Sequence, residues 1–416
     1  MVSVIKENTN DYWRYAFFAA PLAAVGIPIY IYAPKFLVDH HGLSLWSVGA
    51  MFLFLRLIDV IQDPFLGKIA QTIGEYRKHS VLIFVMVLCF SVWFFFVVDP
   101  IFEPLTYFCL SLLIMFTAFS YLNICFYSQG IIFVESKFNN THEGLAAWRE
   151  TGALIGIVTA CLLPTFFQTF GMDAWTGFAI SLVFMLIISN FVMRNCWTHV
   201  PRIRSKVKIL SFLRDGNTRS FLFLAFLNAS PVAVTSTLFL FFVETRLGAA
   251  NFSGIFLLTF FISAAVSVPL WGKLTKYYEL RKLLSIGMLL AIITFGFTFF
   301  LSSGDVFPFL IICGLSGASL GADMSILPAM YASHISKAGF ESSLAFGLWS
   351  FFNKVTLAVS AGVILPILAM TGFVPGEREV EGQFFSLTFF YSLVPCSLKL
   401  LALVALYFGP FERENR

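Results

Sequence analysis

Long apolar stretches alternate with short polar connectors along the whole chain of 416 residues. Each stretch reaches the roughly 20 residues that an α-helix needs to cross the hydrocarbon core of a bilayer. The apolar runs are continuous rather than alternating, which argues against a transmembrane β-barrel. The pattern therefore predicts an all-α membrane protein. Its twelve transmembrane helices are expected at about 12–39, 44–73, 79–99, 104–134, 145–169, 173–196, 219–245, 252–276, 281–302, 306–334, 343–372 and 383–409.

The composition agrees with a polytopic membrane protein. Hydrophobic residues make up 58% of the chain and charged residues only 12%, against about 25% charged in a typical soluble protein. The seven cysteines lie mostly inside apolar runs, which argues against a disulfide framework. We expect no cleavable signal peptide, because the first ten residues are polar and lead into a full-length span.

The distribution of Lys and Arg predicts the orientation in the membrane. Alternate connectors, on one predicted side, hold nearly all the basic loop residues, and the connectors on the other side hold almost none. Such an excess marks the cytoplasmic side, so both termini should be cytoplasmic, and we expect a bacterial inner membrane. The same clustering accounts for the net charge of +4 without a nucleic-acid partner. The basic side carries Lys6, Arg14, Arg77, Lys78, Arg202, Arg204, Lys206, Lys208, Arg214, Lys276, Arg281, Lys282, Arg413 and Arg416.

The longest polar connector divides the chain into two halves. We predict an N-terminal six-helix half at 1–197, a cytoplasmic linker at 198–218 and a C-terminal six-helix half at 219–416. The segment PFLGKIAQTIGEYRK ends the second span, and PLWGKLTKYYELRK ends the eighth. Two parallel six-helix repeats are the architecture of the major facilitator fold. The alternative is that two ordinary helix ends happen to share basic stop signals.

Three charges lie inside the second span, in the segment RLIDVIQDPFLGKIA. A charge at the bilayer centre costs at least about 2.5–3.5 kcal/mol, so Arg56, Asp59 and Asp63 are functional candidates. Two carboxylates four residues apart share a helix face and can hold one cation or one proton. Na⁺ at Asp59 and Asp63, or H⁺, is the expected coupling ion. An Arg56–Asp59 ion pair that anchors packing is the alternative, and Asp63 could instead belong to the cytoplasmic gating region.

The two acids of the second span have no counterpart in the second repeat. Aligning Pro64 with Pro269 sets Asp63 against Val268 and Asp59 against Ala264. A purely structural role would be expected in both halves, so the asymmetry favours a functional site in the N-terminal half.

Other polar residues inside predicted spans complete the set of candidates. Lys354 lies well away from either end of span eleven, which favours a functional role. Lys35 could instead reach the outer interface, and Arg149 could form an ion pair with Glu150 at the cytoplasmic end. The further candidates are Asn123, Tyr127, Asn228 and Asp323.

Several common motifs of nucleotide-binding proteins, hydrolases and zinc proteins are missing from the sequence. There is no Walker A loop, HExxH or zinc-spaced cysteine pattern in the sequence. We therefore expect a protein that is not an enzyme, has no cofactor, and takes its energy from an ion gradient.

The segment RLIDVIQDPFLGKI resembles the span-two pattern R-x-x-D-A-x-x-D-P-x-x-G of the glycoside–pentoside–hexuronide:cation symporter family, to which the melibiose carrier belongs. GLSLWSVGAMFLFLRL, the Arg149–Gly156 spacing, FGLWSFFNKVTLAVSAG and the following TGF extend the resemblance over most of the chain. It implies the major facilitator fold and cation-coupled sugar transport.

The resemblance also implies roles for individual residues. Asp59 and Asp63 would be the carboxylates of the cation site, and Ser120 would be its hydroxyl ligand. Arg149 would contact the sugar, Tyr127 would be an aromatic residue of the sugar site, and Lys354 would be the functional lysine of span eleven.

Departures from the family pattern bear on the solute. Ala23 and Asn123 stand where the melibiose carrier has two further aspartates that hold sugar hydroxyls, and the charged residues retained in the predicted cavity are mostly basic. The hypothesis is therefore an anionic or zwitterionic solute, such as a hexuronide, an acidic glycoside or a lipid-like phosphate. Gln71 and Thr72 replace the acidic and basic residues common in the loop after span two of the wider superfamily.

These observations together predict a secondary active transporter that works as a monomer by alternating access. Its partners would be a small-molecule solute and a coupling cation, Na⁺ or H⁺, with Asp59 binding the cation. Asn123, Tyr127, Arg149 and Lys354 would contact the solute. A lysolipid symporter, proton-driven efflux of hydrophobic compounds, and a membrane receptor or scaffold that does not transport are the alternatives.

Overall fold

The structure is a computed structural model that describes residues 11–136, 141–197, 212, 214–370, 387–409 and 411. The described residues form helices and connecting turns and contain no strand, which confirms the all-α prediction. The long helices are α1 (Tyr12–His41), α2 (Leu45–Thr72), α3 (Arg77–Phe96), α4 (Pro104–Glu135), α5 (His142–Thr169), α6 (Ala174–Met193), α8 (Gly216–Phe241), α9 (Ser253–Leu274), α10 (Leu280–Gly296), α11 (Val306–Lys337), α12 (Ser342–Met370) and α14 (Val394–Phe408).

Each predicted span coincides with one of these helices. Short 3₁₀ or π-helical segments precede or extend several of them. The 3₁₀ segments are η1 (Gly74–Tyr76), η3 (Ala250–Phe252) and η4 (Phe297–Phe300), and the π-helical segments are η2 (Phe242–Arg246) and η5 (Phe389–Leu393). Within the described part, nine helical stretches are long and apolar enough to cross a membrane. Most of the predicted linker at 198–218 lies outside the described residues.

Side-chain caps set the beginnings of several helices. Ser44, Thr141, Asp173 and Asp215 each accept a hydrogen bond from a backbone N–H in the first turn of the helix that follows. Glu103 accepts two such bonds before α4. These caps satisfy amide groups that have no partner within the helix. They explain why the helices begin close to the positions expected from hydropathy.

The chain forms two compact units. Unit 1 comprises residues 1–209 and 332–351, and unit 2 comprises residues 210–331 and 352–416. The division therefore passes through α11 and through α12. The boundaries expected from the sequence, 1–197 and 219–416 around a linker, remain a prediction.

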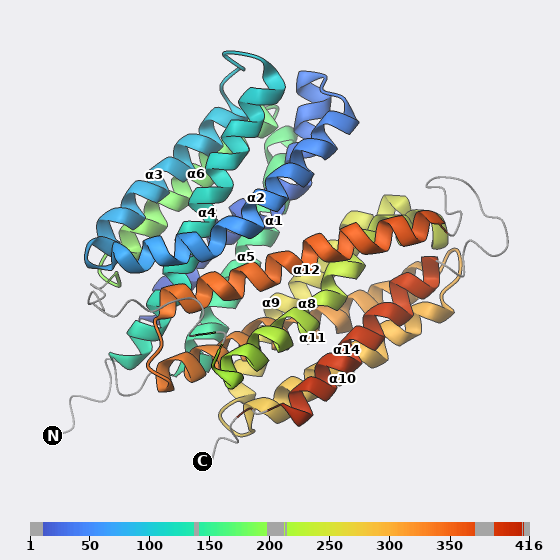
Figure 1. Ribbon diagram of the computed structural model, residues 1–416. Coiled ribbons are helices and arrows are strands. Elements are labelled where there is room, and N and C mark those ends of the chain that lie inside the picture. Colours follow the sequence, from blue (N-terminus) through green and yellow to red (C-terminus); the bar gives the residue numbers. More distant parts are fainter. Residues whose placement is uncertain are drawn as a thin grey trace. The chain divides into compact units, whose positions relative to one another are not determined.

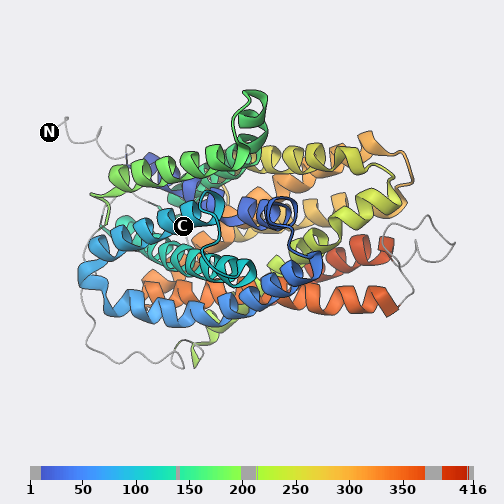
Figure 2. The same cartoon turned by 90° about the horizontal axis from the view of Figure 1, so that it is seen from above.

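Unit 1 contains α1–α6 with the end of α11 and the start of α12. Helix α1 packs along α5 and α6, α3 packs against α4 and α6, and α2 packs against α4. Figure 1 shows these helices in blue to green running alongside one another, and Figure 2 shows them from above. Phe18, Phe95, Phe108, Phe126 and Phe178 are among the large side chains buried in its core.

Small residues allow α1 and α5 to approach closely. A Cβ atom on Gly152 would overlap the backbone of Ala16, and one on Gly156 would overlap the backbone of Ala20. Two glycines four residues apart form the small-xxx-small pattern by which membrane helices come into backbone contact. Because neither α1 backbone segment can withdraw as a flexible side chain would, these glycines set the spacing of the two helices.

Unit 2 is built from α8, α9, α10 and α14 with most of α11 and α12. Helix α14 packs against α8 and α10. Helix α9 approaches α11 where Trp271 Nε1 donates to the carbonyl oxygen of Ala318 at 2.8 Å. Phe242 and Tyr391 stack with ring centroids 4.1 Å apart in its aromatic core.

We expect Gly156→Val to destabilise the protein by at least about 1–3 kcal/mol, since the added side chain must push α1 away from α5. Thermal unfolding of the purified protein in detergent would measure this. The same substitution at Gly49, where a Cβ atom meets nothing within 4 Å, is the matched control and should change the melting temperature little. Equal melting temperatures for the two variants would contradict the close approach of α1 and α5.

Candidate functional site

The carboxylate of Asp59 is buried on α2, facing α4. Its Oδ1 atom accepts hydrogen bonds from Ser120 Oγ at 3.1 Å and from Gln62 Nε2 at 2.9 Å. Thr117 Oγ1 in turn donates to Gln62 Oε1 at 2.9 Å. The structure therefore brings Asp59 and Ser120 together, as the family resemblance implies. It adds Gln62, one helical turn after Asp59, and Thr117 to the cluster.

Asp63 is fully buried and accepts a hydrogen bond from Ser350 Oγ at the start of α12. The two helices are in near backbone contact at this point, because a Cβ atom on Gly347 would lie 2.9 Å from the carbonyl oxygen of Asp63. Asp59 and Asp63 thus have hydrogen-bond partners on different helices. Arg56, on the same helix, is half-buried.

The ligand set available to a metal cation at Asp59 and Asp63 is limited. Among the residues that the structure describes, no three or more His, Cys, Asp or Glu side chains converge as a metal site. Carboxylate, hydroxyl and amide oxygens are ligands that suit a hard cation. A Na⁺ ion would therefore depend on one or two carboxylates with neutral oxygens such as that of Ser120. The cation-binding role of these residues stays a prediction.

Arg149 is the centre of a second buried cluster, between α5 and α4. Its Nε atom donates to Glu150 Oε1 at 2.8 Å, and its guanidinium carbon lies 3.8 Å from the centre of the Tyr127 ring. The Tyr127 hydroxyl donates to the same Glu150 oxygen at 3.0 Å. Arg149 is 6% exposed, and its Nη2 atom has no hydrogen-bond partner among the described residues. The predicted Arg149–Glu150 ion pair therefore forms and still leaves one buried donor group unused.

A third cluster surrounds Arg77 at the start of α3. Arg77 is 1% exposed, and it donates to Gln129 Oε1 at 3.4 Å and to Ser343 Oγ at 2.5 Å. Burial raises the pKa of nearby Glu341, although hydrogen bonds from the backbone at Leu344 and Ser343 oppose the shift. The sequence pattern predicts for Arg77 only a place among the basic residues of a cytoplasmic connector. Its position in an ordinary Arg–Lys pair contains no signal of this burial.

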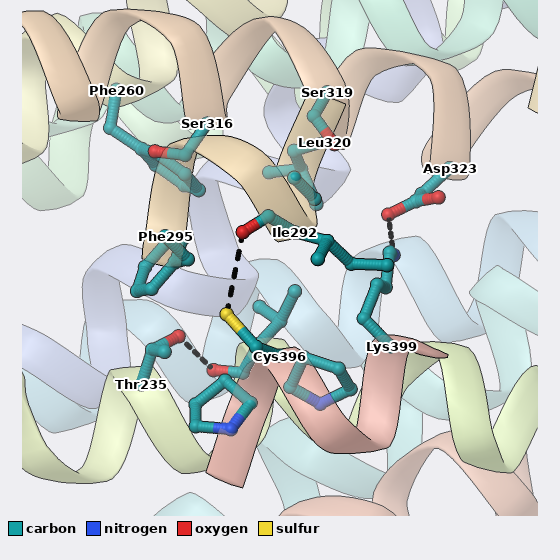
Figure 3. A pocket seen from close by; sticks show the side chains of 14 residues that line it. Thr235, Phe260, Ile292, Phe295, Ser316, Ser319, Leu320, Asp323, Cys396 and Lys399 are labelled. Atoms are coloured by element: carbon teal, nitrogen blue, oxygen red, sulfur yellow. Dashed lines mark hydrogen bonds and ion pairs between the residues drawn. The ribbon is translucent and has the colours of Figure 1, made fainter. Parts of the chain in front are cut away.

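The candidates in unit 2 meet at a residue that the sequence interpretation missed. Lys399 Nζ on α14 donates to Asn228 Oδ1 on α8 at 2.6 Å and to Asp323 on α11. Lys399 lies in the apolar segment SLVPCSLKLLALVALYF, and a lysine within a membrane span is a functional candidate by default. This rule, applied to the last span, would have identified Lys399 as a candidate. Figure 3 shows Asp323 and Lys399 joined at the edge of a cavity.

The remaining predicted residues have less defined surroundings. Asn123 is half-buried on α4 in unit 1, and Lys354 is half-buried on α12 in unit 2. The side chain of Lys35 lies outside the described residues. Direct contact of Asn123, Lys354 or Lys35 with a solute remains a prediction.

Comparison with known proteins places this architecture in a family. The profile of the family described as MFS/sugar transport protein matches residues 14–413. A glucuronide carrier protein homolog of Escherichia coli (strain K12) is 21% identical over 408 residues, 92% of this chain and 88% of its own length. An uncharacterized symporter of Bacillus subtilis (strain 168), YnaJ, is 21% identical over 91% of this chain and 87% of its own length.

A solved structure has the same fold. The crystal structure of a bacterial homologue of the iron transporter ferroportin, in an outward-facing state, superimposes with a TM-score of 0.71. The alignment covers 95% of this chain and 98% of that chain at 14% sequence identity.

The fold and the buried charges thus define a multi-pass membrane transporter of the major facilitator superfamily rather than an enzyme. Within that class, the chain belongs to the MFS/sugar transport protein family, in agreement with its resemblance to the glycoside–pentoside–hexuronide symporters.

We expect Glu150→Gln to lower stability by about 3–5 kcal/mol, because it leaves the buried Arg149 charge without its ion-pair partner. Tyr127→Phe removes only one hydrogen bond and should cost about 1 kcal/mol. Thermal unfolding of the two variants in detergent would measure the difference. A melting temperature of Glu150→Gln equal to that of Tyr127→Phe would show that the ion pair does not stabilise unit 1.

Proposed function

We propose that this protein is a secondary active symporter that couples the movement of Na⁺ or H⁺ to that of an anionic, glycoside-like solute. It would work by alternating access in a bacterial inner membrane, with both termini in the cytoplasm. Membership of the MFS/sugar transport protein family supports sugar-like transport. The relative named as a glucuronide carrier homolog supports an acidic sugar conjugate as solute.

The observation that carries the proposal is the unused donor of Arg149. A buried donor without a partner costs about 1–3 kcal/mol, and more when the group is charged. A solute carboxylate would satisfy Nη2 and would form a charge-assisted hydrogen bond, which is stronger than a neutral one. The Tyr127 ring and Glu150 hold the guanidinium in place from one side. This arrangement favours an anion over a neutral sugar.

The Asp59 cluster supports the coupling half of the proposal. A carboxylate that takes up a cation or a proton inside the membrane changes its charge, and a change of charge alters the cost of exposing that site to either side. Ser120 and Gln62 both donate to the Oδ1 atom of Asp59. They would keep the carboxylate oriented in both charge states.

Alternative functions make different demands on these two clusters. A lysolipid symporter would also use Arg149, for a phosphate, but would reject small glucuronides. Proton-driven efflux of hydrophobic compounds would need no anion contact at Arg149. A receptor or scaffold would tolerate neutralisation of Asp59 without any loss, since it moves nothing.

Arg149→Gln should lower the uptake of 4-nitrophenyl glucuronide into proteoliposomes by about 10-fold or more, as expected for the loss of a charged hydrogen bond of roughly 1.5–3 kcal/mol. The wild-type protein should also take up this probe in preference to the neutral 4-nitrophenyl glucoside. Arg194→Gln, at an exposed arginine, is the matched control. Uptake of the glucoside but not of the glucuronide would overturn the anionic solute.

Asp59→Asn should abolish accumulation driven by a Na⁺ or H⁺ gradient while leaving the fold and the exchange of labelled for unlabelled solute intact. The amide cannot bind a proton or neutralise a cation, although it fills the same space. Asp173→Asn is the control, since asparagine caps a helix about as well as aspartate does. Gradient-driven accumulation at the wild-type level in Asp59→Asn would rule out Asp59 as the coupling site.

A further inference from the structure

The Lys399–Asp323–Asn228 cluster has no part in the function proposed above. It lies wholly within unit 2, with one side chain from each of α14, α11 and α8. Lys399 is 3% exposed and Asp323 is 9% exposed. Ionisable residues this deep in membrane helices are costly and tend to mark ion or proton pathways. An ion pair that only holds three helices together is the competing explanation.

One oxygen of the cluster has nothing bonded to it. Asp323 Oδ2 accepts from Lys399, but Oδ1 is buried and has no hydrogen-bond partner among the described residues. A buried acceptor without a donor carries an uncompensated desolvation cost. An ion pair with a purely structural role would be more stable if a second donor group formed a hydrogen bond to this oxygen.

Asp323 and Lys399 line a cavity, seen in Figure 3. The centre of a water molecule can reach about 50 Å³ of it. Since one water needs about 10–15 Å³ in this measure, the cavity has room for a few water molecules. The cavity thus has space for water beside the Asp323 side chain.

The polar lining of the cavity presents hydrogen-bond acceptors. The hydroxyl protons of Thr235, Ser316 and Ser319 are all donated to backbone carbonyl oxygens, and the thiol of Cys396 is directed to the carbonyl oxygen of Ile292. A hydroxyl oxygen that has given its proton can still accept. The cavity therefore suits a species that donates hydrogen bonds, such as water or hydronium.

We propose that Asp323 and Lys399 form a proton-binding site in unit 2, in which Oδ1 of Asp323 takes up the proton. A hydronium ion in the cavity gives its proton to Oδ1 and leaves a water molecule, and the carboxylate becomes a carboxylic acid. Lys399 keeps its own proton and its hydrogen bond to Asn228. The charge of the cluster changes from zero to +1, and the ion pair is broken.

Electrostatics selects the proton over a metal cation. The Lys399 ammonium already neutralises Asp323, so the site has no net negative charge with which to repay the dehydration of Na⁺. A proton forms a covalent bond to oxygen, which offsets the opposition of the adjacent Lys399 ammonium to its uptake. Among the described residues that line the cavity, from α8, α9, α10, α11 and α14, the titratable groups are Asp323, Lys399 and Cys396.

Infrared difference spectroscopy of the full chain in lipid tests proton binding directly, without a solute. Acidification of the wild-type protein should produce the carbonyl stretch of a buried carboxylic acid. Asp323→Asn should remove that band, and Asp59→Asn should leave it in place. A spectrum of Asp323→Asn identical to that of the wild type would overturn the proposal.

A paired variant separates the proton site from a structural ion pair. Asp323→Asn with Lys399→Gln removes both charges together, so no uncompensated charge is left behind. In proteoliposomes without Na⁺, this variant should exchange solute but should no longer accumulate it in response to a pH gradient. Wild-type accumulation by the folded paired variant would make the pair structural and overturn the proposal.

The claim that protonation drives transport rests on the proposed function. The claim that the site binds a proton does not. Failure of the wild-type protein to transport any glucuronide would contradict the proposed function. The infrared band would then still decide the proton site.

Discussion

The cost of placing an ionisable side chain inside a membrane governs this structure. Asp59, Asp63, Arg149 and Lys399 are each buried on a helix of the bundle, and each has a polar partner on a neighbouring helix or on the adjacent residue. Apolar side chains do not fix one helix against another in lipid, because the lipid tails are equally apolar. Polar pairs therefore act together with close packing at small residues to decide which helices meet.

The close approaches between helices follow from this requirement and from small residues beside the charges. Short side chains such as Asp63 and Ser350 can meet only if α2 and α12 come together, and Gly67 and Gly347 permit it. A larger residue at either glycine would separate the Asp63 carboxylate from the Ser350 hydroxyl. The close packing of α2 against α12 and the hydrogen bond to the Asp63 carboxylate therefore depend on each other.

Sequence patterns could predict the helices of this protein but only part of its buried chemistry. The spans follow from hydropathy, because a bilayer imposes one length on every helix, and caps such as Ser44 mark where they begin. The link between Asp59 and Ser120 could be expected only from the family resemblance. No periodicity relates Arg77 to Ser343, which is 266 positions away, or Lys399 to Asn228, which is 171 positions away. These pairings arise only from the tertiary structure, where a basic residue near a loop and a lysine within the last span become buried.

The division of α12 between the two units has a consequence for how the chain can be divided into fragments. The first turns of α12 belong with α1–α6, although they follow the linker by more than a hundred positions in the sequence. A cut in that linker would therefore yield an N-terminal fragment without Ser343 and Ser350. Arg77 would keep Gln129 but lose Ser343, and Asp63 would lose Ser350, until the second fragment supplied them. Each compact unit thus includes segments from both sides of the predicted linker or of α12, so the compact units differ from the two predicted halves.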